Sequence, residues 1–363
     1  MQRRSVTKAL GAGLALSALG SGAERMRAVM ITEPGGLHLD MYFAALAAAT
    51  EIESVAVCDA GGGSEALARR ILGPKLSGFH RDLRPMLAKE KPLLAAISME
   101  GVTSPPVIDA ALDAGCHVLA EKPACVRLED FERLAAKARA RNRYLVLALA
   151  NRVDPVMIEA RRLLRDGEIG KVYGVEVRFV ADQTRLTQPA YHKSWRAQKA
   201  RAAGGHLMWL GIHWLDLAAF VTGSPVQSVA AFTANVGGQP LDVEDSAAVA
   251  MRFANGTLGT LTSGYYLDKG YDSELKVWGA NGWLLIQKHR DVPLQWYSNG
   301  RMHRLDSTVK PSGDVYAGFL RGVARACLGL QPPPLTTDES VAALKTVFAC
   351  YRAAESGRSE RVA

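Results

Sequence analysis

The sequence contains no pair of cysteines in a C-x-x-C spacing, and its five cysteines are an odd number. Neither a disulfide framework nor a zinc site is therefore indicated, and no other ligand-spacing motif predicts a metal. The charged residues make up 22% of the 363 positions and form no long run of one sign, although the net charge is +8. Nucleic-acid-binding proteins usually concentrate such charge on one face or arm. We therefore predict no nucleic-acid partner.

Long apolar runs are also missing at the amino terminus, where residues 1–25 combine a basic start with a short apolar stretch over 9–19. This stretch has about half of the ~20 residues that cross a bilayer, so we predict no membrane span. The pair Arg3-Arg4 ahead of it resembles a twin-arginine signal. We expect export to the periplasm, or a cytoplasmic protein if translation starts at Met26.

The length and the hydrophobic content of 48% are typical of a soluble globular protein with about two domains. In residues 26–150, short apolar runs alternate with helical stretches. Strands are indicated at 28–31, 54–59, 93–98, 117–120 and 144–150, and helices at 40–50, 64–72, 106–114 and 128–141. This alternation is typical of a parallel sheet with helices on both faces. We predict that residues 26–150 form the first domain.

Residues 151–363 show a different pattern, in which apolar and polar residues alternate along each expected strand. Such strands are indicated at 172–181, 228–235, 246–253, 257–263, 273–278 and 283–287. Helices are expected at 206–221, 314–328 and 337–354. The alternation predicts a second, α+β domain with an open, mainly antiparallel sheet and one solvated face. We expect the protein to form a homo-oligomer through that open sheet.

The segment Glu121-Lys122-Pro123 follows the expected strand 117–120. It resembles the strand-end E-K-P signature of the Gfo/Idh/MocA oxidoreductases, which include glucose–fructose oxidoreductase and inositol dehydrogenase. Further matches keep the family's order after residue 26: Asn151-Arg152 with Pro155, Asp166 to Gly170, Trp195-Arg196, Gly204-Gly205 through His213 to Asp216, Val243 to Ser246, and Phe253 to Gly256. The resemblance implies a Rossmann doubly wound parallel sheet, followed by a domain whose open sheet covers the cofactor.

The resemblance implies a nicotinamide dinucleotide, NAD(P), whose pyrophosphate approaches a glycine-rich loop after the first strand. The family's usual G-x-G-x-x-G is degenerate here, because only the adjacent Gly35 and Gly36 remain. Glu33 would place a carboxylate near the phosphates, and Pro34 removes an amide donor. These departures leave open the alternative that the dinucleotide is not bound.

Asp59 stands where an acid would bind the adenosine ribose, and Ala60 rather than an arginine follows it. This pattern favours NAD over NADP. The candidate cofactor-binding residues are Gly35, Gly36, Asp59, Glu121, Lys122, Pro123, Trp195 and Arg196.

The candidate catalytic residues are Lys122 and His213, because oxidation of an alcohol requires a base for the hydroxyl proton. Desolvation and neighbouring charge can lower the pKa of a lysine towards neutrality. The family commonly places an aspartate four residues before the histidine, where this sequence has Trp209.

Four further side chains are candidates for substrate binding, and they are Arg152, Tyr191, His206 and Trp209. The sequence thus predicts an exported oxidoreductase that acts on a sugar, glycoside or cyclitol hydroxyl with NAD(P). Two alternatives remain open at this stage. One is a relative that has lost the dinucleotide and performs non-redox elimination or epimerisation, and the other is a non-catalytic sugar-binding protein.

Overall fold

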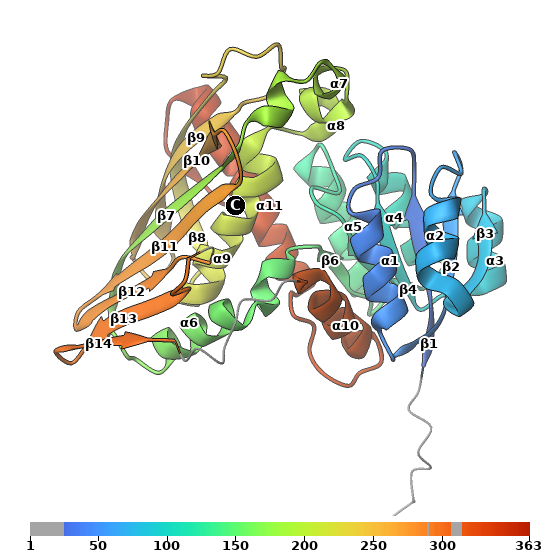
Figure 1. The fold of residues 1–363 in the computed structure, drawn as a ribbon, viewed down its shortest axis with the longest axis horizontal. Coiled ribbons are helices and arrows are strands. Elements are labelled where there is room, and N and C mark those ends of the chain that lie inside the picture. The colour runs from blue at the N-terminus through green and yellow to red at the C-terminus, as the bar shows by residue number, and fades with distance from the viewer. Residues whose placement is uncertain (1–24, 289, 306–313) are drawn as a thin grey trace, which may run out of the picture.

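The computed structural model describes residues 25–288, 290–305 and 314–363. A parallel sheet and a mainly antiparallel sheet lie at opposite ends of the molecule, with helices of both domains between them (Figure 1). Residues 1–24 of the expected signal segment lie outside the described residues. The expected fold class, a Rossmann sheet followed by an α+β domain, is confirmed.

The first sheet has six parallel strands in the order β3-β2-β1-β4-β5-β6, with the change of direction beside β1 that dinucleotide-binding sheets show. The strands are β1 (Met26–Thr32), β2 (Ile52–Asp59), β3 (Leu76–His80), β4 (Leu94–Ser98), β5 (His117–Ala120) and β6 (Leu145–Leu147). The helices are α1 (Leu39–Ala48), α2 (Glu65–Leu72), α3 (Leu83–Glu90), α4 (Ser104–Asp113) and α5 (Leu128–Ala140). Strands such as β4 are buried along their whole length, because helices cover both faces.

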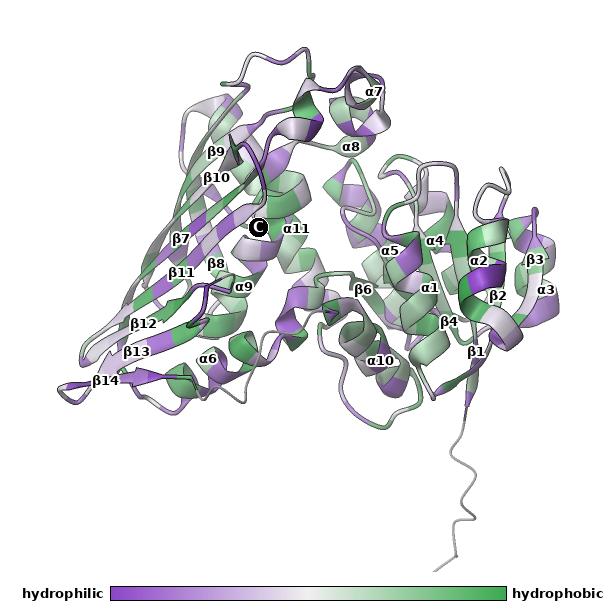
Figure 2. Ribbon diagram, viewed as in Figure 1, coloured by the Kyte–Doolittle hydropathy of each residue, from purple (hydrophilic) through white to green (hydrophobic). Residues whose placement is uncertain are grey.

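The second sheet has nine strands in the order β14-β13-β12-β11-β7-β10-β9-β8-β15. They are β7 (Val172–Asp182), β8 (Val226–Ala234), β9 (Ser246–Phe253), β10 (Leu258–Leu267), β11 (Tyr271–Gly279), β12 (Gly282–Ile286), β13 (Leu294–Ser298), β14 (Arg301–Arg304) and β15 (Glu360–Arg361). Among the described strands of this second sheet, only β7 and β10 pair in parallel. Buried and exposed residues alternate along β9, and Figure 2 shows the matching mixture of apolar and polar positions.

Helices of the second half join the two sheets. They are α6 (Pro155–Arg165), α7 (Pro189–His192), α8 (Lys199–Ala202), α9 (Ile212–Thr222), α10 (Val315–Cys327) and α11 (Thr337–Ser356). Helix α10 packs against α1 of the first domain, and α11 packs against α5 and β8. The Thr337 and Ser340 hydroxyls accept hydrogen bonds from the Leu145 and Leu147 amides of β6, at 3.0 and 3.2 Å. The start of α11 therefore satisfies amides that an edge strand would leave free.

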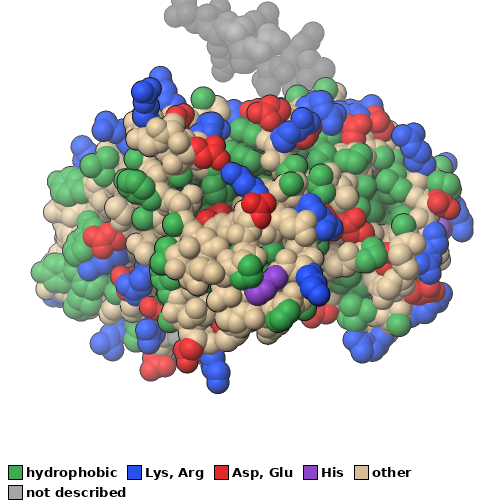
Figure 3. All heavy atoms as spheres, turned by 90° about the horizontal axis from the view of Figure 1, so that it is seen from above, with side chains coloured by type: hydrophobic (Ala, Val, Ile, Leu, Met, Phe, Trp, Pro, Cys, Tyr) green, Lys and Arg blue, Asp and Glu red, His purple; other side chains and the backbone are tan. Residues whose placement is uncertain are grey.

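The surface carries charges of both signs. In the face shown in Figure 3, basic and acidic side chains are interspersed. Within the described ranges, no helix is both long and apolar enough to cross a membrane, and no three His, Cys, Asp or Glu side chains gather as metal ligands.

Candidate active site between the two domains

A cavity of about 340 Å³ lies between the two domains. Its walls include His38 from the loop after β1, Lys122 just after β5, His213 from α9, and Phe179 and Tyr271 from the inner face of the second sheet. Ligands of open α/β sheets bind outside the carboxyl ends of the strands, where this cavity opens. Its volume is at the lower end of the range of about 300–1,000 Å³ that holds small molecules. We take this cavity as the candidate active site.

Lys122 extends from the end of β5 towards the second domain. Its Nζ donates a hydrogen bond to the Trp209 carbonyl oxygen at 2.6 Å and lies 4.4 Å from the centre of a Trp209 ring. The residue is 4% exposed. Burial lowers the lysine pKa from 10.5 to about 8; Glu121 opposes this shift, and Arg185 and Arg196 add to it. An amine with this pKa is partly neutral near neutral pH and can accept a proton.

The backbone before α9 forms a π-helical turn, Leu207–Gly211, where the sequence predicted one continuous helix. Such turns are frequent at functional sites. Here the turn includes Trp209, whose carbonyl oxygen accepts the Lys122 hydrogen bond. Gly205 precedes the turn, and a Cβ at this position would lie 1.8 Å from the Glu244 carbonyl oxygen. The glycine therefore allows the chain to pass close to the Glu244 backbone as it enters the turn.

His213 lines the cavity one turn further along the helix. Its Nδ1 is buried and has no hydrogen-bond partner among the described residues. Burial lowers the histidine pKa to about 3, and the charge of Lys122 adds to this effect. The imidazole is therefore neutral at physiological pH. It can hydrogen-bond to a substrate hydroxyl but does not carry a positive charge there.

A buried carboxylate, that of Glu121, lies beside Lys122 in sequence and contacts three side chains. Its Oε2 accepts hydrogen bonds from Tyr42 at 2.9 Å and Tyr316 at 3.2 Å, and lies 3.4 Å from His38 Nδ1. Burial alone would raise the glutamate pKa, but the His38 contact and the Lys122 charge lower it. The tyrosines from α1 and α10 thus hold an ionised carboxylate that balances part of the lysine charge.

The loop between β1 and α1 packs its two glycines closely against neighbouring atoms. Gly35 has a φ of +90°, and a Cβ at Gly36 would lie 2.1 Å from the Thr32 hydroxyl and 2.9 Å from the Ser98 carbonyl oxygen. The Leu37 amide donates to Ser98 Oγ at 2.9 Å and fastens the loop to the end of β4. The loop leads into the amino terminus of α1, where the first amides have no intrahelical partner and favour an anion. This arrangement fits the pyrophosphate of a dinucleotide.

Glu33, which the sequence placed near the phosphates, is held by the loop that follows β4. Its Oε1 accepts hydrogen bonds from the Glu100 amide at 2.7 Å and the Thr103 hydroxyl at 2.8 Å. The Glu100 side chain accepts a hydrogen bond from Arg201 Nε of α8 at 2.8 Å. Glu33, a departure from the family pattern, and Glu100 therefore belong to one network that reaches the second domain.

Asp59 ends β2, as the sequence predicted, and its carboxylate caps the following loop. Oδ1 accepts from the Gly61 amide at 3.0 Å, and Oδ2 accepts from the Ser64 amide and hydroxyl at 2.9 and 2.8 Å. Burial alone would raise the aspartate pKa, but these hydrogen bonds lower it and keep the group ionised. Asp59 is 1% exposed, and its hydrogen bonds hold the loop after β2 in place.

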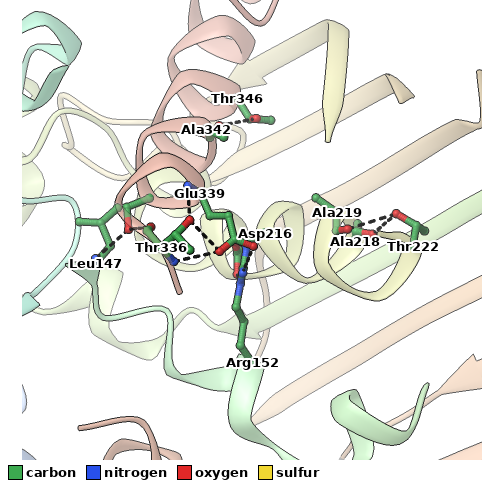
Figure 4. Close-up of polar contacts among 11 residues, drawn as sticks. Leu147, Arg152, Asp216, Ala218, Ala219, Thr222, Thr336, Glu339, Ala342 and Thr346 are labelled. Carbon is green, nitrogen blue, oxygen red and sulfur yellow. Dashed lines mark hydrogen bonds and ion pairs between the residues drawn. The ribbon is translucent and has the colours of Figure 1, made fainter. Parts of the chain in front are cut away.

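Arg152, a predicted substrate contact, does not lie in this cavity. Its guanidinium binds Asp216 through two hydrogen bonds of 2.9 and 2.7 Å and donates to Glu339 at 2.6 Å (Figure 4). These contacts fasten the turn after β6 to α9 and α11. The arginine therefore has a packing role that its position in the family motif did not reveal.

His206 is also absent from the cavity wall. It is completely buried, with Nδ1 2.7 Å from Ser263 Oγ, and burial lowers its pKa to about 3. The predicted residues Tyr191, Arg196 and Trp209 do line the cavity.

Two more predicted cofactor residues lie beside the cavity wall. The Trp195 ring packs edge-on against Trp209 at 5.1 Å, and its Nε1 would be 3.4 Å from a Cβ on Gly35. Trp195 thus lies next to the phosphate loop. Pro123 is buried directly after Lys122.

Several cavity residues carried no sequence signal. Arg185, Tyr265 and Tyr316 belong to no motif, and Tyr316 approaches the site only because α10 folds back onto α1. Tyr42 lies on the buried side of α1, where an aromatic residue would be assigned to the hydrophobic core from the sequence. Their roles depend on contacts between segments far apart in the sequence.

Comparison with known families agrees with this architecture. Residues 36–149 match the oxidoreductase family with an NAD-binding Rossmann fold, and residues 157–285 match the GFO/IDH/MocA C-terminal domain. The two matches together cover more than half of the chain. The chain belongs to the Gfo/Idh/MocA family. The resemblance is thus confirmed, and this membership makes the chain an NAD(P)-dependent oxidoreductase and favours redox chemistry over the non-redox alternative.

Curated relatives and solved structures show similar proteins. Myo-inositol 2-dehydrogenase of Thermotoga maritima is 24% identical over 263 residues, which are 70% of this chain and 75% of the relative. Levoglucosan dehydrogenase of Pseudarthrobacter phenanthrenivorans is 27% identical over 173 residues, which are 42% of this chain and 44% of that protein. The WlbA dehydrogenase of Bordetella pertussis, solved with NADH and UDP-GlcNAcA, has a TM-score of 0.81 at 21% identity and covers 93% of this chain and 98% of its own. This structural likeness shows the shared fold.

Proposed function

We propose that this family member oxidises a hydroxyl group of a sugar, glycoside or cyclitol with NAD as the hydride acceptor. The names of the curated relatives support a carbohydrate-like substrate. The observation that carries the proposal is the buried Lys122 amine, whose pKa of about 8 suits a general base in a cavity between the two domains. Ala60 after Asp59 supports NAD rather than NADP.

The side chains of the cavity divide the work in this proposal. Gly35, Gly36 and the start of α1 would hold the pyrophosphate, and the nicotinamide would supply the hydride acceptor. The neutral Lys122 amine takes the hydroxyl proton as the carbon loses its hydride. His213 stays neutral and orients the hydroxyl through a hydrogen bond, because its pKa lies far below physiological pH.

The test is turnover of a defined panel by the purified protein. Myo-inositol, levoglucosan, glucose, D-glucuronate and glucose 6-phosphate are offered with NAD or NADP, and formation of the reduced nicotinamide is followed by absorbance. Reduction that requires both sugar and NAD, and that Lys122→Ala abolishes, is expected. Sugar consumption without any nucleotide, with none retained on the protein by mass spectrometry, would contradict the proposal.

We also propose that two copies associate through the outer face of the second sheet. This face carries small and hydroxyl side chains at Ala248, Ala250, Thr260 and Thr262, with the apolar Leu258 57% exposed. Such a flat surface can pack against its own copy around a two-fold axis. Sedimentation of wild type and Thr260→Arg is the test, and a wild-type monomer contradicts the proposal.

Export through the twin-arginine system is a further proposal and rests on Arg3-Arg4 with Lys8 and the short apolar stretch that follows. Replacing both arginines with lysine should leave the precursor in the cytoplasm, because the receptor recognises the arginine pair. Periplasmic recovery of the lysine variant would contradict it.

A further inference from the structure

The candidate active site has a cationic wall. Lys122, Arg185, Arg196 and Lys288 line the cavity, and no aspartate or glutamate of the described chain does so. Lys288 is neutralised, because its Nζ lies 2.9 Å from Asp154 Oδ2. The Glu121 carboxylate balances part of the Lys122 charge, whereas Arg185 and Arg196 have no carboxylate within ion-pair distance in the described part of the protein.

The two arginines contact aromatic rings instead of acids. The Arg185 guanidinium carbon lies 5.6 Å from the centre of the Tyr265 ring, and that of Arg196 lies 5.3 Å from the Tyr191 ring. Aromatic faces orient a guanidinium without neutralising it. Arg185 also forms a hydrogen bond with the Tyr271 side chain, which is a neutral partner, and a guanidinium has five N–H donors in all. The edge of a guanidinium matches the oxygens of a carboxylate or phosphate in a two-bond arrangement.

Clustering of like charges has a free-energy cost that an anion would remove. Arg185 and Arg196 both lower the pKa of Lys122, and Arg185 also lowers that of His206, so these groups are close enough to repel one another. Charges that are partly removed from water and lack a counter-ion destabilise a folded protein. The cations of the cavity wall that have no carboxylate partner therefore form a binding site suited to an anionic group.

The two arginines occupy different parts of the wall. Arg196 directly follows Trp195, which packs on the phosphate loop at Gly35, and its guanidinium lies over the Tyr191 ring. Arg185 lies in the 3-10 turn after β7 and near Tyr265 of β10, on the side of the second sheet. The second sheet faces the space that remains for the substrate once the dinucleotide occupies the first domain.

We infer that the substrate of this enzyme carries an anionic group, a carboxylate or a phosphate, which Arg185 binds while the reacting hydroxyl faces Lys122. This inference rests on the proposed dehydrogenase function and specifies its substrate class as acidic sugars, such as uronates or sugar phosphates. Neutral sugars would leave the cationic wall without a partner. Arg185 is then a specificity residue rather than a proton-transfer residue.

The test measures binding without nucleotide, so that it does not depend on turnover. D-Glucuronate and D-galacturonate are titrated against wild type and compared with their neutral amides, with glucose 6-phosphate compared with glucose. The quenching of tryptophan fluorescence reports binding, because Trp209 and Trp214 line the cavity. We expect at least one anion to bind about 10- to 100-fold more tightly than its neutral partner, as for a hydrogen bond between charged groups. The uronate and phosphate arms identify which anionic group is bound.

The Arg185→Gln variant should abolish the preference for the anion, and Arg185→Lys should restore part of it. The matched control is Arg178→Gln, because Arg178 lies on β7 but pairs with Asp272 and Glu274 at 3.3 and 3.4 Å. This control should leave the preference unchanged. If Arg185→Gln does not fold, the affinities of the wild-type protein for each acid and its neutral amide still test whether the anion is preferred.

Two results would overturn the inference while leaving the dehydrogenase function intact. One is equal affinity for every acid and its neutral partner in a protein that binds NAD. The other is a fall in NAD affinity in Arg185→Gln with unchanged binding of the acid, which would assign Arg185 to the dinucleotide. Failure of wild type to bind NAD would instead contradict the proposed function, and the nucleotide-free titration would still report the anion preference.

Discussion

Two buried cations of the second-domain interface, Arg152 and Lys122, are exposed by only 5% and 4% yet have opposite surroundings. Arg152 has the carboxylates of Asp216 and Glu339. Lys122 donates to a backbone carbonyl and lies over an indole ring, and the nearby Glu121 carboxylate balances its charge only in part. Burial alone would lower the pKa of both, but the two acids raise that of Arg152, whereas that of Lys122 falls to about 8.

The comparison teaches that burial of a charge does not by itself identify a functional residue. A buried charge with good partners becomes part of the fold and loses its reactivity. A buried charge whose partners are neutral keeps a perturbed pKa, which is typical of active sites. Both residues belong to family motifs, so only their partners separate the two roles.

The largest expected effect is on stability. Arg152→Met leaves Asp216, which is 4% exposed, without its partner, and removing one member of a buried pair costs about 3–5 kcal/mol. Urea unfolding of wild type and variant measures this loss. Arg161→Met is the matched control, because Arg161 only lies over the Phe220 ring at 4.3 Å and should contribute less than about 1 kcal/mol. Equal losses in the two variants would remove the distinction drawn above.

The next effect is on turnover. Lys122→Ala should lower the rate by about a hundredfold or more while the fold remains intact, as expected for loss of a general base. Lys75→Ala is the matched control, since Lys75 also donates to a carbonyl, that of Ala49, at 2.6 Å but lies in the first domain away from the cavity. Steady-state rates measure the loss of turnover, and circular dichroism shows whether each variant keeps its fold. An unchanged rate in the Lys122 variant would exclude it from the mechanism.

The pH dependence tests the same amine without removing it. The rate of oxidation should be low below pH 8 and rise to a plateau above it, because only the neutral Lys122 amine accepts the proton. His213, with a pKa of about 3, should add no inflection in this range. A rate that falls as the pH rises through 8 would contradict the assignment.

Stability should follow the same group. The lysine pKa is lower in the folded state than its ordinary 10.5, so the unfolded chain binds more protons between pH 8 and 10.5 and stability rises with pH over that window. Lys122→Met should therefore raise the unfolding midpoint at pH 7 and lose this advantage above pH 10.5. Arg152→Met should lower the midpoint at both pH values.

The fold was largely predictable from the sequence because its periodicities are local. Apolar runs and alternation predicted β1, β2, β4 and β5 and most of the second sheet. The strand β3 was missed, because only Leu76 and Phe79 of its five residues are apolar and none is fully buried. Strand β13 and the two edge strands, β14 and β15, were missed as well.

The site was predictable only where a motif marked it. Lys122, His213 and Trp209 were found through family motifs, and the structure places all three on one cavity. Arg152 and His206 were assigned to the substrate, but their contacts with Asp216 and Ser263 come from segments distant in sequence. Such tertiary pairing leaves no local pattern in a single chain.

The smallest expected effect concerns Glu33. Like Arg152, its side chain has good hydrogen-bond partners, and like Lys122, it has no ion-pair partner of opposite charge. It has hydrogen-bond donors in the Glu100 amide and the Thr103 hydroxyl, but no basic partner within ion-pair distance in the described chain. Its charge therefore remains beside the phosphate loop, where it opposes binding of a pyrophosphate. Glu33→Gln keeps an acceptor oxygen for both donors and removes the charge. We expect NAD to bind up to about tenfold more tightly, since a like charge a few ångströms from phosphate costs on the order of 1 kcal/mol.

Titration calorimetry of NAD against wild type, Glu33→Gln and the control Glu53→Gln measures this difference. Glu53 is an exposed residue of β2, so its substitution should change the affinity little. High salt should reduce the difference between wild type and Glu33→Gln, because ions screen a repulsion between charges but leave hydrogen bonds of the loop in place. A variant that binds NAD no better than wild type at low salt would mean that the Glu100 and Thr103 donors already hold the carboxylate away from the phosphates. The degenerate loop would then bind the phosphates of NAD without any loss of affinity caused by Glu33.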